Sequence, residues 1–315
     1  MDEFALIARF FSRPPRNPQV ALSIGDDAAL LDISGRLAIT TDTLLVGVHF
    51  ADGALARDIG HKALAVNLSD LAAMGARPRF FLLNLSLPAA DESWLAGFSA
   101  GLFALADAHG VDLVGGDTVR GPLGVTITAL GELPAGRGLT RRGARAGDHI
   151  YVTGRLGDAA LGFAYRQGRV QLAGAWRDEL CARLDRPAPR VDEGCALLQI
   201  ASAAIDISDG LAADLGHMME ASGTGAEVDL RHLPVADAYG ACFPVVGWEA
   251  ALSFGDDYEL CFTVPPERRE ALERVSAGFA SGIRHIGEVV AAPGVRWFEG
   301  GRAYVPAGRG FNHFG

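Results

Sequence analysis

The chain has 315 residues, of which 49% are hydrophobic, and a formal net charge of −10 at pH 7. This length allows two domains of ordinary size, and the acidic balance argues against nucleic acid or an anionic membrane as a partner. No apolar run reaches the length of a membrane span and no signal peptide is apparent, so the sequence predicts a cytoplasmic protein.

The first part of the chain alternates between strand and helix patterns. In chain order, periodicity predicts a helix at 2–12, strands at 28–33 and 37–44, a helix at 56–74, a strand at 79–87, a helix at 91–108, and strands at 111–119 and 123–133. A turn around Ser34 and Gly35 is expected to join the first two strands. This order is typical of an α+β domain and not of a strict series of βαβ units.

The segment 134–148 is rich in glycine and arginine and has no periodicity, which indicates a linker. We therefore expect an N-terminal domain at 1–136 and a C-terminal α+β domain at 147–315. The second domain is predicted to contain strands at 149–153, 203–206, 226–230 and 258–264, short strands near 284–299, and helices at 156–167, 176–184, 191–202, 209–222 and 266–277.

Composition also limits how the chain could handle phosphate. Lys62 is the only lysine and follows His61, so no G-x-x-x-x-G-K-[ST] phosphate loop exists, and no G-x-G-x-x-G fingerprint is present either. The four cysteines are scattered without a CxxC pair, which favours free thiols over a zinc site or a disulfide framework. A phosphate-binding site in this chain would have to use metal-bound carboxylates, arginine and backbone amides.

Six aspartates lie in apolar or glycine-rich frames, where a carboxylate needs a hydrogen bond, a cation or a metal. They are Asp27, Asp42, Asp70, Asp117, Asp206 and Asp209. If several converge, their mutual repulsion calls for a divalent ion, and an all-oxygen ligand set favours Mg²⁺, Mn²⁺ or Ca²⁺ over zinc. Each motif taken alone also has an ordinary structural explanation. This is a turn for the motifs of Asp27 and Asp117, a threonine-rich strand face for Asp42 and a polar network in the core for Asp70. For the segment 206–209 it is a helix cap.

Other polar groups accompany these carboxylates. Thr40 and Thr41 precede Asp42 at the expected end of a strand, and Gly116 precedes Asp117 where a ligand could approach the backbone closely. Ser208 lies between Asp206 and Asp209 at a strand-to-helix junction. There Ser208 or Asp209 could cap the helix, and the amides at its start would suit a phosphate.

Nine segments together resemble one known family. In order they are IGDDAAL, TTDTLLVGVHF, NLSDLAAMGARP, LVGGDT, GLTRRGARAGD, VTGRLGDAALG, DISDGL, FGDDYEL and GFNHF, between residues 24 and 314. They resemble the thiamine-monophosphate kinase family of the aminoimidazole ribonucleotide synthetase-like ATP-binding superfamily. The resemblance implies a two-domain α+β fold, with a mixed or antiparallel N-terminal sheet and helices. It also implies a homodimer formed through the N-terminal domains, and direct in-line transfer of phosphate from ATP to thiamine monophosphate with several Mg²⁺ ions and without a general base.

The same resemblance assigns roles to residues of this chain. The metal cluster would comprise Asp27, Thr40, Thr41, Asp42, Asp70, Asp117, Asp206 and Asp209. Contacts to ATP would come from Gly116, Asp117, Arg141 and Ser208, and contacts to thiamine monophosphate from His49, Asp256 and Phe311. The chain departs from the family pattern at two of these positions, since the family usually has Glu at Asp256 and Trp or Tyr at Phe311.

Two alternatives stay open at this point. One is another ATP-dependent member of the superfamily, but a selenophosphate synthetase would need a reactive cysteine or selenocysteine near its N-terminus, and the first cysteine here is Cys181. A hydrogenase-maturation dehydratase would end in a cysteine-bearing tail, whereas this chain ends in His313-Phe314-Gly315. The other alternative is a non-catalytic module that binds Mg²⁺ and nucleotide without turnover.

Overall fold

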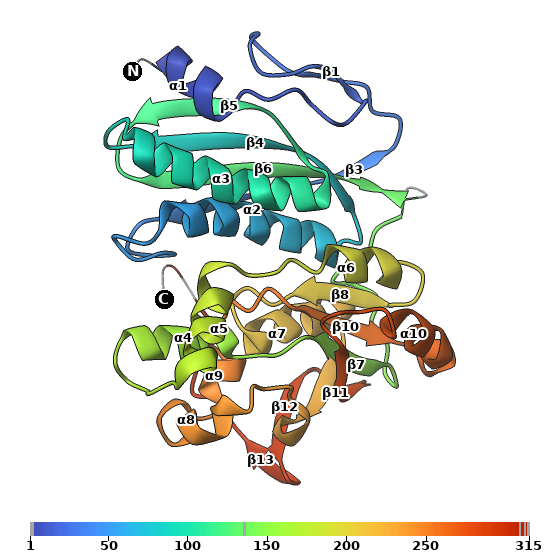
Figure 1. The fold of residues 1–315 in the computed structure, drawn as a ribbon. Coiled ribbons are helices and arrows are strands. Elements are labelled where there is room, and N and C mark those ends of the chain that lie inside the picture. The colour runs from blue at the N-terminus through green and yellow to red at the C-terminus, as the bar shows by residue number, and fades with distance from the viewer. Residues whose placement is uncertain (1–2, 135–136, 309, 312, 314–315) are drawn as a thin grey trace. The chain divides into compact units, whose positions relative to one another are not determined.

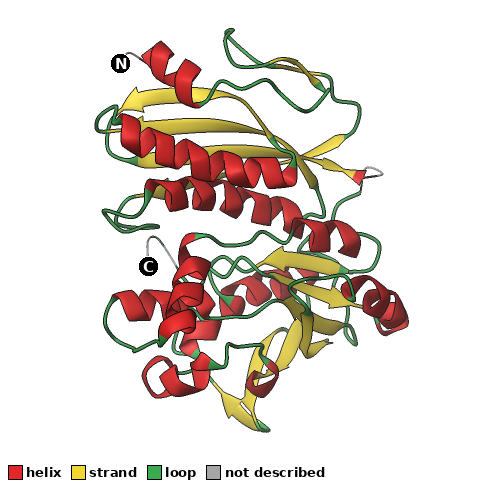
Figure 2. Cartoon of the chain, in the orientation of Figure 1, coloured by secondary structure: helices red, strands yellow, loops and turns green. Residues whose placement is uncertain are grey.

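The computed structural model describes residues 3–134, 137–308, 310, 311 and 313, and the chain divides into two compact units (Figure 1). The N-terminal unit comprises Met1–Leu71 and Ala76–Arg137, and the C-terminal unit comprises Ala72–Gly75 and Gly138–Gly315. Both units combine helices with a sheet (Figure 2), which confirms the predicted α+β class. Among the described residues, no helix is both long and apolar enough to cross a membrane.

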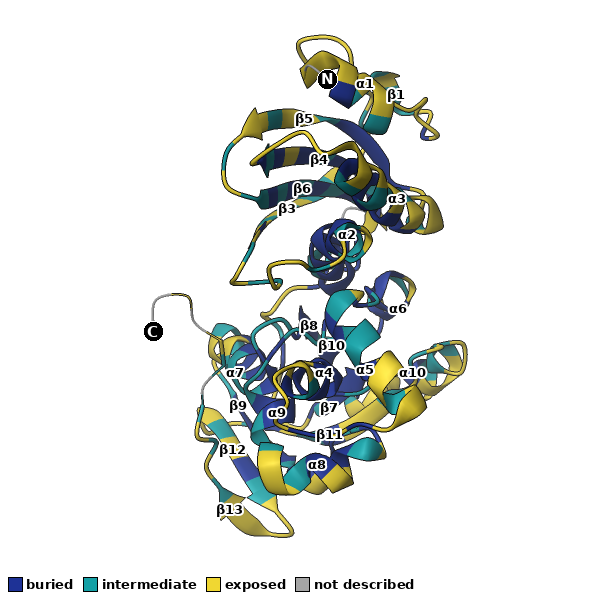
Figure 3. Cartoon of the chain, turned by 60° about the vertical axis from the view of Figure 1, so that its left-hand side comes forward, coloured by how far each residue is buried: buried dark blue, intermediate teal, exposed yellow. Residues whose placement is uncertain are grey.

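A four-stranded mixed sheet forms the centre of the N-terminal unit. Its strands lie in the order β3 (Arg36–Leu45), β6 (Gly124–Leu133), β4 (Arg77–Leu87) and β5 (Asp112–Arg120). Only the β4–β5 pair is parallel, because the helix α3 (Glu92–His109) connects those two strands. The helices α2 (Ala56–Ala73) and α3 pack on one face of this sheet (Figure 1), and most of α2 is buried (Figure 3).

The sequence explains why α3 begins and ends where it does. Asp91 is the N-cap, and its carboxylate accepts the backbone N–H groups of Ser93 at 2.8 Å and Trp94 at 3.2 Å. At the other end Gly110 adopts the left-handed conformation, with φ 64°, that terminates many helices. The predicted helix at 91–108 is therefore confirmed within one residue at each end.

The strands before and after the predicted turn at Ser34 and Gly35 do not pair with each other. The helix α1 (Glu3–Phe10) is followed by a separate two-stranded sheet of β1 (Val20–Leu22) and β2 (Leu30–Leu31). Ser34 and Gly35 do not close a hairpin, because β2 pairs with β1 while all ten residues of β3 pair with β6. The choice of partner is decided by long-range pairing, which local periodicity does not specify.

The C-terminal unit is built on a seven-stranded sheet. Its order is β13 (Arg302–Tyr304), β12 (Gly294–Glu299), β9 (Gly225–Asp229), β11 (Ile283–Val290), β7 (His149–Thr153), β10 (Leu260–Val264) and β8 (Ala203–Asp206). Its α-helices are α4 (Asp158–Arg166), α5 (Gly174–Asp185), α6 (Val191–Leu197), α7 (Leu211–Ser222), α8 (Ala238–Val246), α9 (Glu249–Leu252) and α10 (Arg269–Ser276). Only the β9–β12 pair is parallel.

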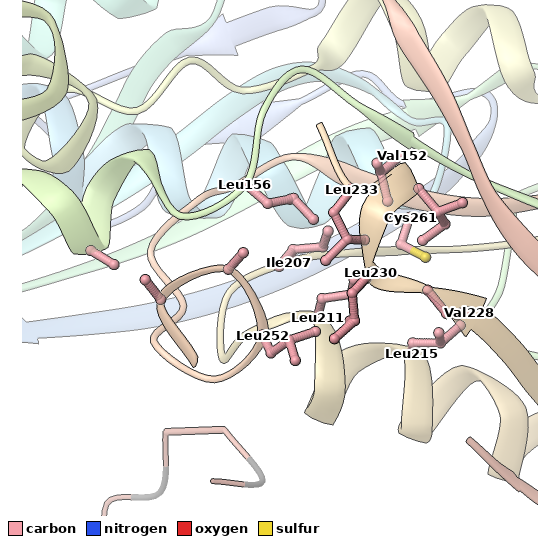
Figure 4. Close-up of a cluster of buried hydrophobic side chains, with 14 of the residues drawn as sticks. Val152, Leu156, Ile207, Leu211, Leu215, Val228, Leu230, Leu233, Leu252 and Cys261 are labelled. Atoms are coloured by element: carbon pink, nitrogen blue, oxygen red, sulfur yellow. The ribbon is translucent and has the colours of Figure 1, made fainter. Parts of the chain in front are cut away.

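Aliphatic side chains from the strands and from α7 form the core of this unit. Figure 4 shows Val152 and Val228 from the sheet facing Leu211 and Leu215 of α7, and all four are fully buried. The sequence predicted β7 and β8 to the residue, but it missed α8, α9 and β13 and made α6 five residues too long. Helix α8 contains Pro244 and is nearly all apolar, so it carries no amphipathic stripe.

Candidate active site

Strand β3 and helix α2 bring three of the predicted residues together in the N-terminal unit. The hydroxyl of Thr40 donates a short hydrogen bond to the carboxylate of Asp70. Asp42 lies two residues along β3 from Thr40, so both side chains point to the face that packs against α2. These residues lie inside a strand of ten residues and not at its end, which corrects the expected position of the TTDT motif.

The neighbouring Thr41 points to the opposite face of the sheet. Its hydroxyl donates to the carbonyl of Ile127 at 3.1 Å and accepts from the hydroxyl of Thr128 at 3.1 Å. The side chain of Thr41 is thus engaged with β6, away from Asp42. The predicted ligand pair Thr40 and Thr41 is therefore divided between the two faces.

Asn67, one turn before Asp70 on α2, holds a buried oxygen without a partner. Its side chain is fully buried and its Nδ2 donates to the carbonyl of Ala63 at 3.0 Å, but its Oδ1 accepts no hydrogen bond. An unsatisfied buried carbonyl is costly, commonly by about 1–3 kcal/mol. Thr40, Asp42, Asn67 and Asp70 therefore offer several oxygen atoms that could serve as metal ligands. One of them, Oδ1 of Asn67, accepts no hydrogen bond.

Asp117 lies at the other edge of the N-terminal sheet. It is exposed on β5, and its carboxylate accepts the N–H of Thr118 at 2.8 Å. Gly116 must be glycine, because it has φ 141° and an added Cβ would lie 1.8 Å from the carbonyl oxygen of Leu83. The sheet order puts β5 three strands from β3, or about 14 Å at ordinary strand spacing. The structure therefore does not bring Asp117 next to Asp42.

Asp27 also stands apart from the β3–α2 group. It is exposed in the loop between β1 and β2, where its N–H bonds to the carboxylate of Asp26 at 2.8 Å and Gly25 has φ 121°. Within the described part of the chain, no three carboxylate, histidine or cysteine side chains stand close enough to hold a metal ion. Within the N-terminal unit, Asp27 and Asp117 thus lie on other elements than the group formed by Thr40, Asp42 and Asp70.

His49 lies on the loop that follows β3, and its ring is oriented by the backbone. The ring Nδ1 of His49 accepts the backbone N–H of Leu45 at 3.0 Å. The backbone N–H of His49 in turn donates to the carbonyl of Leu45 at 3.0 Å. Below this loop the side chain of Lys62 is only 4% exposed and donates to the carbonyl of His49 at 3.4 Å. The single lysine of the chain thus supports the loop from within the unit.

A cavity of about 340 Å³ begins beside His49. Its walls include the aromatic rings of Phe50 and Trp94 and the carboxylates of Asp52 and Asp91. All the residues that line it belong to the N-terminal unit. The cavity combines flat apolar surfaces with negative charge, but Asp91 is already committed to capping α3.

In the C-terminal unit the loop between β8 and α7 carries Asp206, Ser208 and Asp209. Asp206 is the last residue of β8 and is buried, while Ser208 and Asp209 are half-buried. Neither Ser208 nor Asp209 caps α7, which corrects the expected cap. The N-cap is Gly210, with φ 113° and no side-chain bond.

The unpredicted Asp214 fills the capping role from inside the helix. Its Oδ2 accepts the N–H groups of Ser208, Asp209 and Gly210, each at 3.1 Å. Burial raises the pKa of Asp214 to about 7 and the charge of Asp209 adds to this, while the three N–H groups act in the opposite direction. Because Asp214 already accepts these three N–H groups, they are not available to a phosphate.

The loop at 255–258 is hydrogen-bonded directly to the loop between β8 and α7. The N–H of Asp256 bonds to the carbonyl of Ser208 at 2.9 Å, and the N–H of Tyr258 bonds to that of Ile207 at 2.8 Å. The approach is so close that a Cβ on Gly255 would lie 2.2 Å from the carbonyl oxygen of Ser208. Asp256 has φ 61° and Tyr258 φ 50°, and the Tyr258 hydroxyl donates to the Asp256 carboxylate at 3.1 Å.

The tail of the chain joins the same group. The N–H of Phe311 bonds to the carbonyl of Asp209 at 3.0 Å, and its ring, 46% exposed, meets the ring of His313 edge-on at 4.8 Å. The rest of the GFNHF motif, residues 312 and 314, lies outside the described residues. The structure therefore brings Ser208, Asp209, Asp256 and Phe311 together.

Arg141 interacts electrostatically with Asp209 and so belongs with Ser208, Asp256 and Phe311. Burial raises the pKa of Asp209, and the carboxylate of Asp256 adds to this rise. Three cationic groups act in the opposite direction: His217, His313 and Arg141. Arg141 is exposed, and its carbonyl accepts the hydroxyl of Ser222 at 3.1 Å, which anchors its backbone beside α7. The result is an open site with acidic, cationic and aromatic groups in reach of one another.

Comparison with known proteins defines the class of this chain. Residues 25–133 match the family model of the AIR synthase related protein, N-terminal domain, and residues 145–298 match that of its C-terminal domain. A solved structure of thiamine-monophosphate kinase from Stenotrophomonas maltophilia K279a is similar, with a TM-score of 0.86 and 45% identity over 96% of this chain and 98% of that one. The fold is thus that of an AIR synthase-like protein.

Two further relatives narrow the class. A curated thiamine-monophosphate kinase from Escherichia coli (strain K12) is 48% identical over 318 residues, covering 99% of this chain and 98% of the relative. A structure described as AaThiL complexed with AMPPCP and TMP has a TM-score of 0.79 and 32% identity, covering 93% of this chain and 92% of that one. The chain belongs to the thiamine-monophosphate kinase family within the AIR synthase related proteins, which confirms the family resemblance of its motifs.

Proposed function

We propose that this protein transfers the γ-phosphate of ATP to thiamine monophosphate, giving thiamine diphosphate and ADP. The observation that carries the proposal is the 48% identity to a curated thiamine-monophosphate kinase over 99% of the chain. The related structure described with AMPPCP and TMP supports a site for an ATP analogue and a phosphorylated acceptor. The contacts among Ser208, Asp209, Asp256 and Phe311 provide a place in this chain where both could bind.

We propose Mg²⁺ as the metal, because the donors present are carboxylate, hydroxyl and amide oxygens. In the N-terminal unit the ligands would be Asp27, Thr40, Asp42, Asp70 and Asp117, with Thr41 contributing through its backbone because its hydroxyl is bonded to β6. In the C-terminal unit they would be Asp206 and Asp209. The unsatisfied Oδ1 of Asn67, one turn from Asp70, suits the same ion. Bound Mg²⁺ would neutralise the charge of the transferring phosphate group.

His49 would bind the phosphate of the acceptor. Its Nδ1 accepts the N–H of Leu45, so the neutral ring carries its proton on Nε2. That N–H can donate to a phosphate oxygen. The nucleophile is an anionic phosphate oxygen, so the reaction needs no general base, and direct in-line transfer is the mechanism that we propose.

The other substrate contacts would come from the C-terminal unit. The thiazolium ring is cationic, so the carboxylate of Asp256 and the face of Phe311 are suitable neighbours for it. The Tyr258 hydroxyl holds the Asp256 carboxylate at 3.1 Å, which limits its motion. Gly116, Asp117, Arg141 and Ser208 would contact ATP, with Arg141 neutralising a phosphate. We propose that domain 1–136 supplies ATP, metal and dimer contacts and that domain 147–315 completes the site.

We also propose a cytoplasmic homodimer formed through the N-terminal domains. The face of the N-terminal sheet away from α2 and α3 exposes Ile39, Leu45 and Val119 by 65%, 45% and 51%. Between them lie threonines that bond to each other, with Thr43 and Thr126 at 2.8 Å. A sheet face of this kind, with exposed apolar side chains, is suited to burial against a second copy.

The test is to incubate the purified full chain with ATP, Mg²⁺ and thiamine monophosphate and to measure thiamine diphosphate and ADP by chromatography. We expect both products to appear in equal amounts and only with the monophosphate as acceptor. ADP without diphosphate would favour another activity of the superfamily. Bound ATP without any turnover would favour the non-catalytic module.

A further inference from the structure

A pair of histidines lies in the C-terminal sheet, among residues to which the proposed reaction assigns no role. His149 begins β7 and His285 lies on the adjacent strand β11. The Nδ1 atom of His149 is 3.2 Å from the Nε2 atom of His285, and the ring centroids are 5.0 Å apart. His285 is exposed and His149 half-buried, so the pair is accessible to solvent.

A β-bulge places these two rings against each other. His285 pairs with Tyr151, and Glu288 pairs with His149. Between these two pairs β11 advances three residues while β7 advances two, and the irregularity lies between His285 and Gly287. Bulges commonly redirect a side chain in this way. Gly287 is required there, since an added Cβ would lie 2.1 Å from the carbonyl oxygen of Glu227. Directly paired residues share a face, so Glu288 lies on the same side as both rings.

The surroundings favour the neutral form of His285 and restrict the orientation of both rings. Burial lowers the pKa of His285 and the charge of His149 adds to this, while Glu288 acts in the opposite direction. The ring of Tyr151 packs at 5.3 Å from that of His285 and at 6.5 Å from that of His149. Neutral imidazole is the form that binds metals, and packing of this kind limits the rotamers of both ligands.

The spacing fits a bound ion. Two nitrogen ligands at 2.0–2.1 Å from a tetrahedral metal are about 3.3 Å apart. We propose that His149 and His285 chelate a late first-row transition-metal ion, such as Zn²⁺, Co²⁺ or Cu²⁺. Across the described ranges no group of three such ligands is preformed, so water would complete the coordination. Glu288 would offset part of the charge. Imidazole ligands distinguish this site from the all-oxygen site proposed for Mg²⁺.

The competing explanation is a plain hydrogen bond, in which one ring N–H donates to the other ring. A plain hydrogen bond predicts no Co²⁺ or Cu²⁺ binding that depends on both rings, whereas a chelate predicts such binding. The test uses the full chain without a histidine tag, in excess Mg²⁺ and without ATP or thiamine compounds. Co²⁺ is titrated and followed by visible absorption, and Cu²⁺ is followed by electron paramagnetic resonance. The result is therefore independent of the proposed kinase activity.

We expect one Co²⁺ site whose affinity falls about tenfold or more in His149→Gln and equally in His285→Gln, because a chelate needs both rings. The double variant should bind no worse than either single variant. His109→Gln, at the end of α3, is the matched control and should bind as the parent chain does. Glu288→Gln should weaken binding only a few-fold.

The proposal is overturned if the parent chain binds no Co²⁺ under these conditions, or if one single variant retains the parent affinity. If a histidine variant does not fold, as judged by its melting temperature without metal, the parent chain still decides the matter. Its Cu²⁺ spectrum should then show hyperfine splitting from two imidazole nitrogens. Splitting from a single nitrogen would contradict chelation.

Discussion

The two units of this protein present their functional residues in different ways. In the N-terminal unit the carboxylates lie on separate elements, with Asp42 and Asp117 on opposite edge strands of one sheet. In the C-terminal unit the backbone itself joins the loops, since Asp256 and Phe311 donate their N–H groups to the carbonyls of Ser208 and Asp209. The first arrangement keeps the carboxylates apart, and under the proposed function bound Mg²⁺ ions would link them. The second arrangement is fixed by folding alone.

This difference explains why the two groups should respond differently to substitution. A carboxylate whose task is to bind an ion can be lost with little effect on the fold, but at a large cost in activity. A substitution at a close backbone contact has the opposite effect, because it lowers the free energy of unfolding before it affects activity. The four experiments below sharpen or contradict this contrast, and they run from the largest expected effect to the smallest.

Asp42→Asn should lower turnover by about 100-fold or more at saturating Mg²⁺, because it removes a charge that, in the proposed site, would hold the ion beside the transferring phosphate. The melting temperature should change little. Turnover is measured against Mg²⁺ concentration, and Asp32→Asn, an exposed carboxylate after β2, serves as the control. Near-normal turnover would remove Asp42 from the metal site.

Gly255→Ala should destabilise the C-terminal unit by about 3 kcal/mol or more. The residue has φ 82°, and an added Cβ would lie 2.2 Å from the carbonyl oxygen of Ser208. Gly216→Ala is the control, since a Cβ there meets nothing within 4 Å and should stabilise α7 by up to about 1 kcal/mol. Urea unfolding measures both, and equal effects would mean that the junction is not tight.

Phe311→Ala should raise the KM for thiamine monophosphate about five- to tenfold and leave the KM for ATP within about twofold. The reason is that the lost ring would face the thiazolium and not the nucleotide. Phe4→Ala removes a ring that is 81% exposed on α1 and is the matched control. If both KM values rise equally, Phe311 has a structural role.

His285→Gln should flatten the loss of stability in mild acid. Burial and the charge of His149 lower the pKa of His285 in the folded protein, so the unfolded chain binds more protons in this range. The contribution of His285 is thus complete above its unfolded pKa, near 6.5, and is lost as the pH falls through its folded pKa. Unfolding in urea from pH 5 to 8 with a chelator measures this slope. An unchanged slope would contradict the pKa direction, and His109→Gln is the control.

The sequence predicted elements with regular periodicity and missed relations that depend on three dimensions. The helix α3 carried its own cap in Asp91, and β8 is a short apolar run that follows Ser202 and ends at Asp206, so both were recognisable. Helix α8 has no amphipathic stripe, and the pairing of β3 with β6 joins segments that are far apart in the sequence. The motifs pointed to Asp209 and Asp256, but nothing marked Asp214, because a buried acid in the first turn of a helix resembles an ordinary surface acid.

The burial of Lys62 has a practical consequence for labelling this chain. Amine-directed reagents such as succinimidyl esters react with exposed lysine side chains and with the α-amino group of a chain. Here the one lysine is 4% exposed, beneath the loop that carries His49. Under native conditions such a reagent should therefore leave Lys62 unmodified. Reaction at Lys62 would then report that the His49 loop has opened.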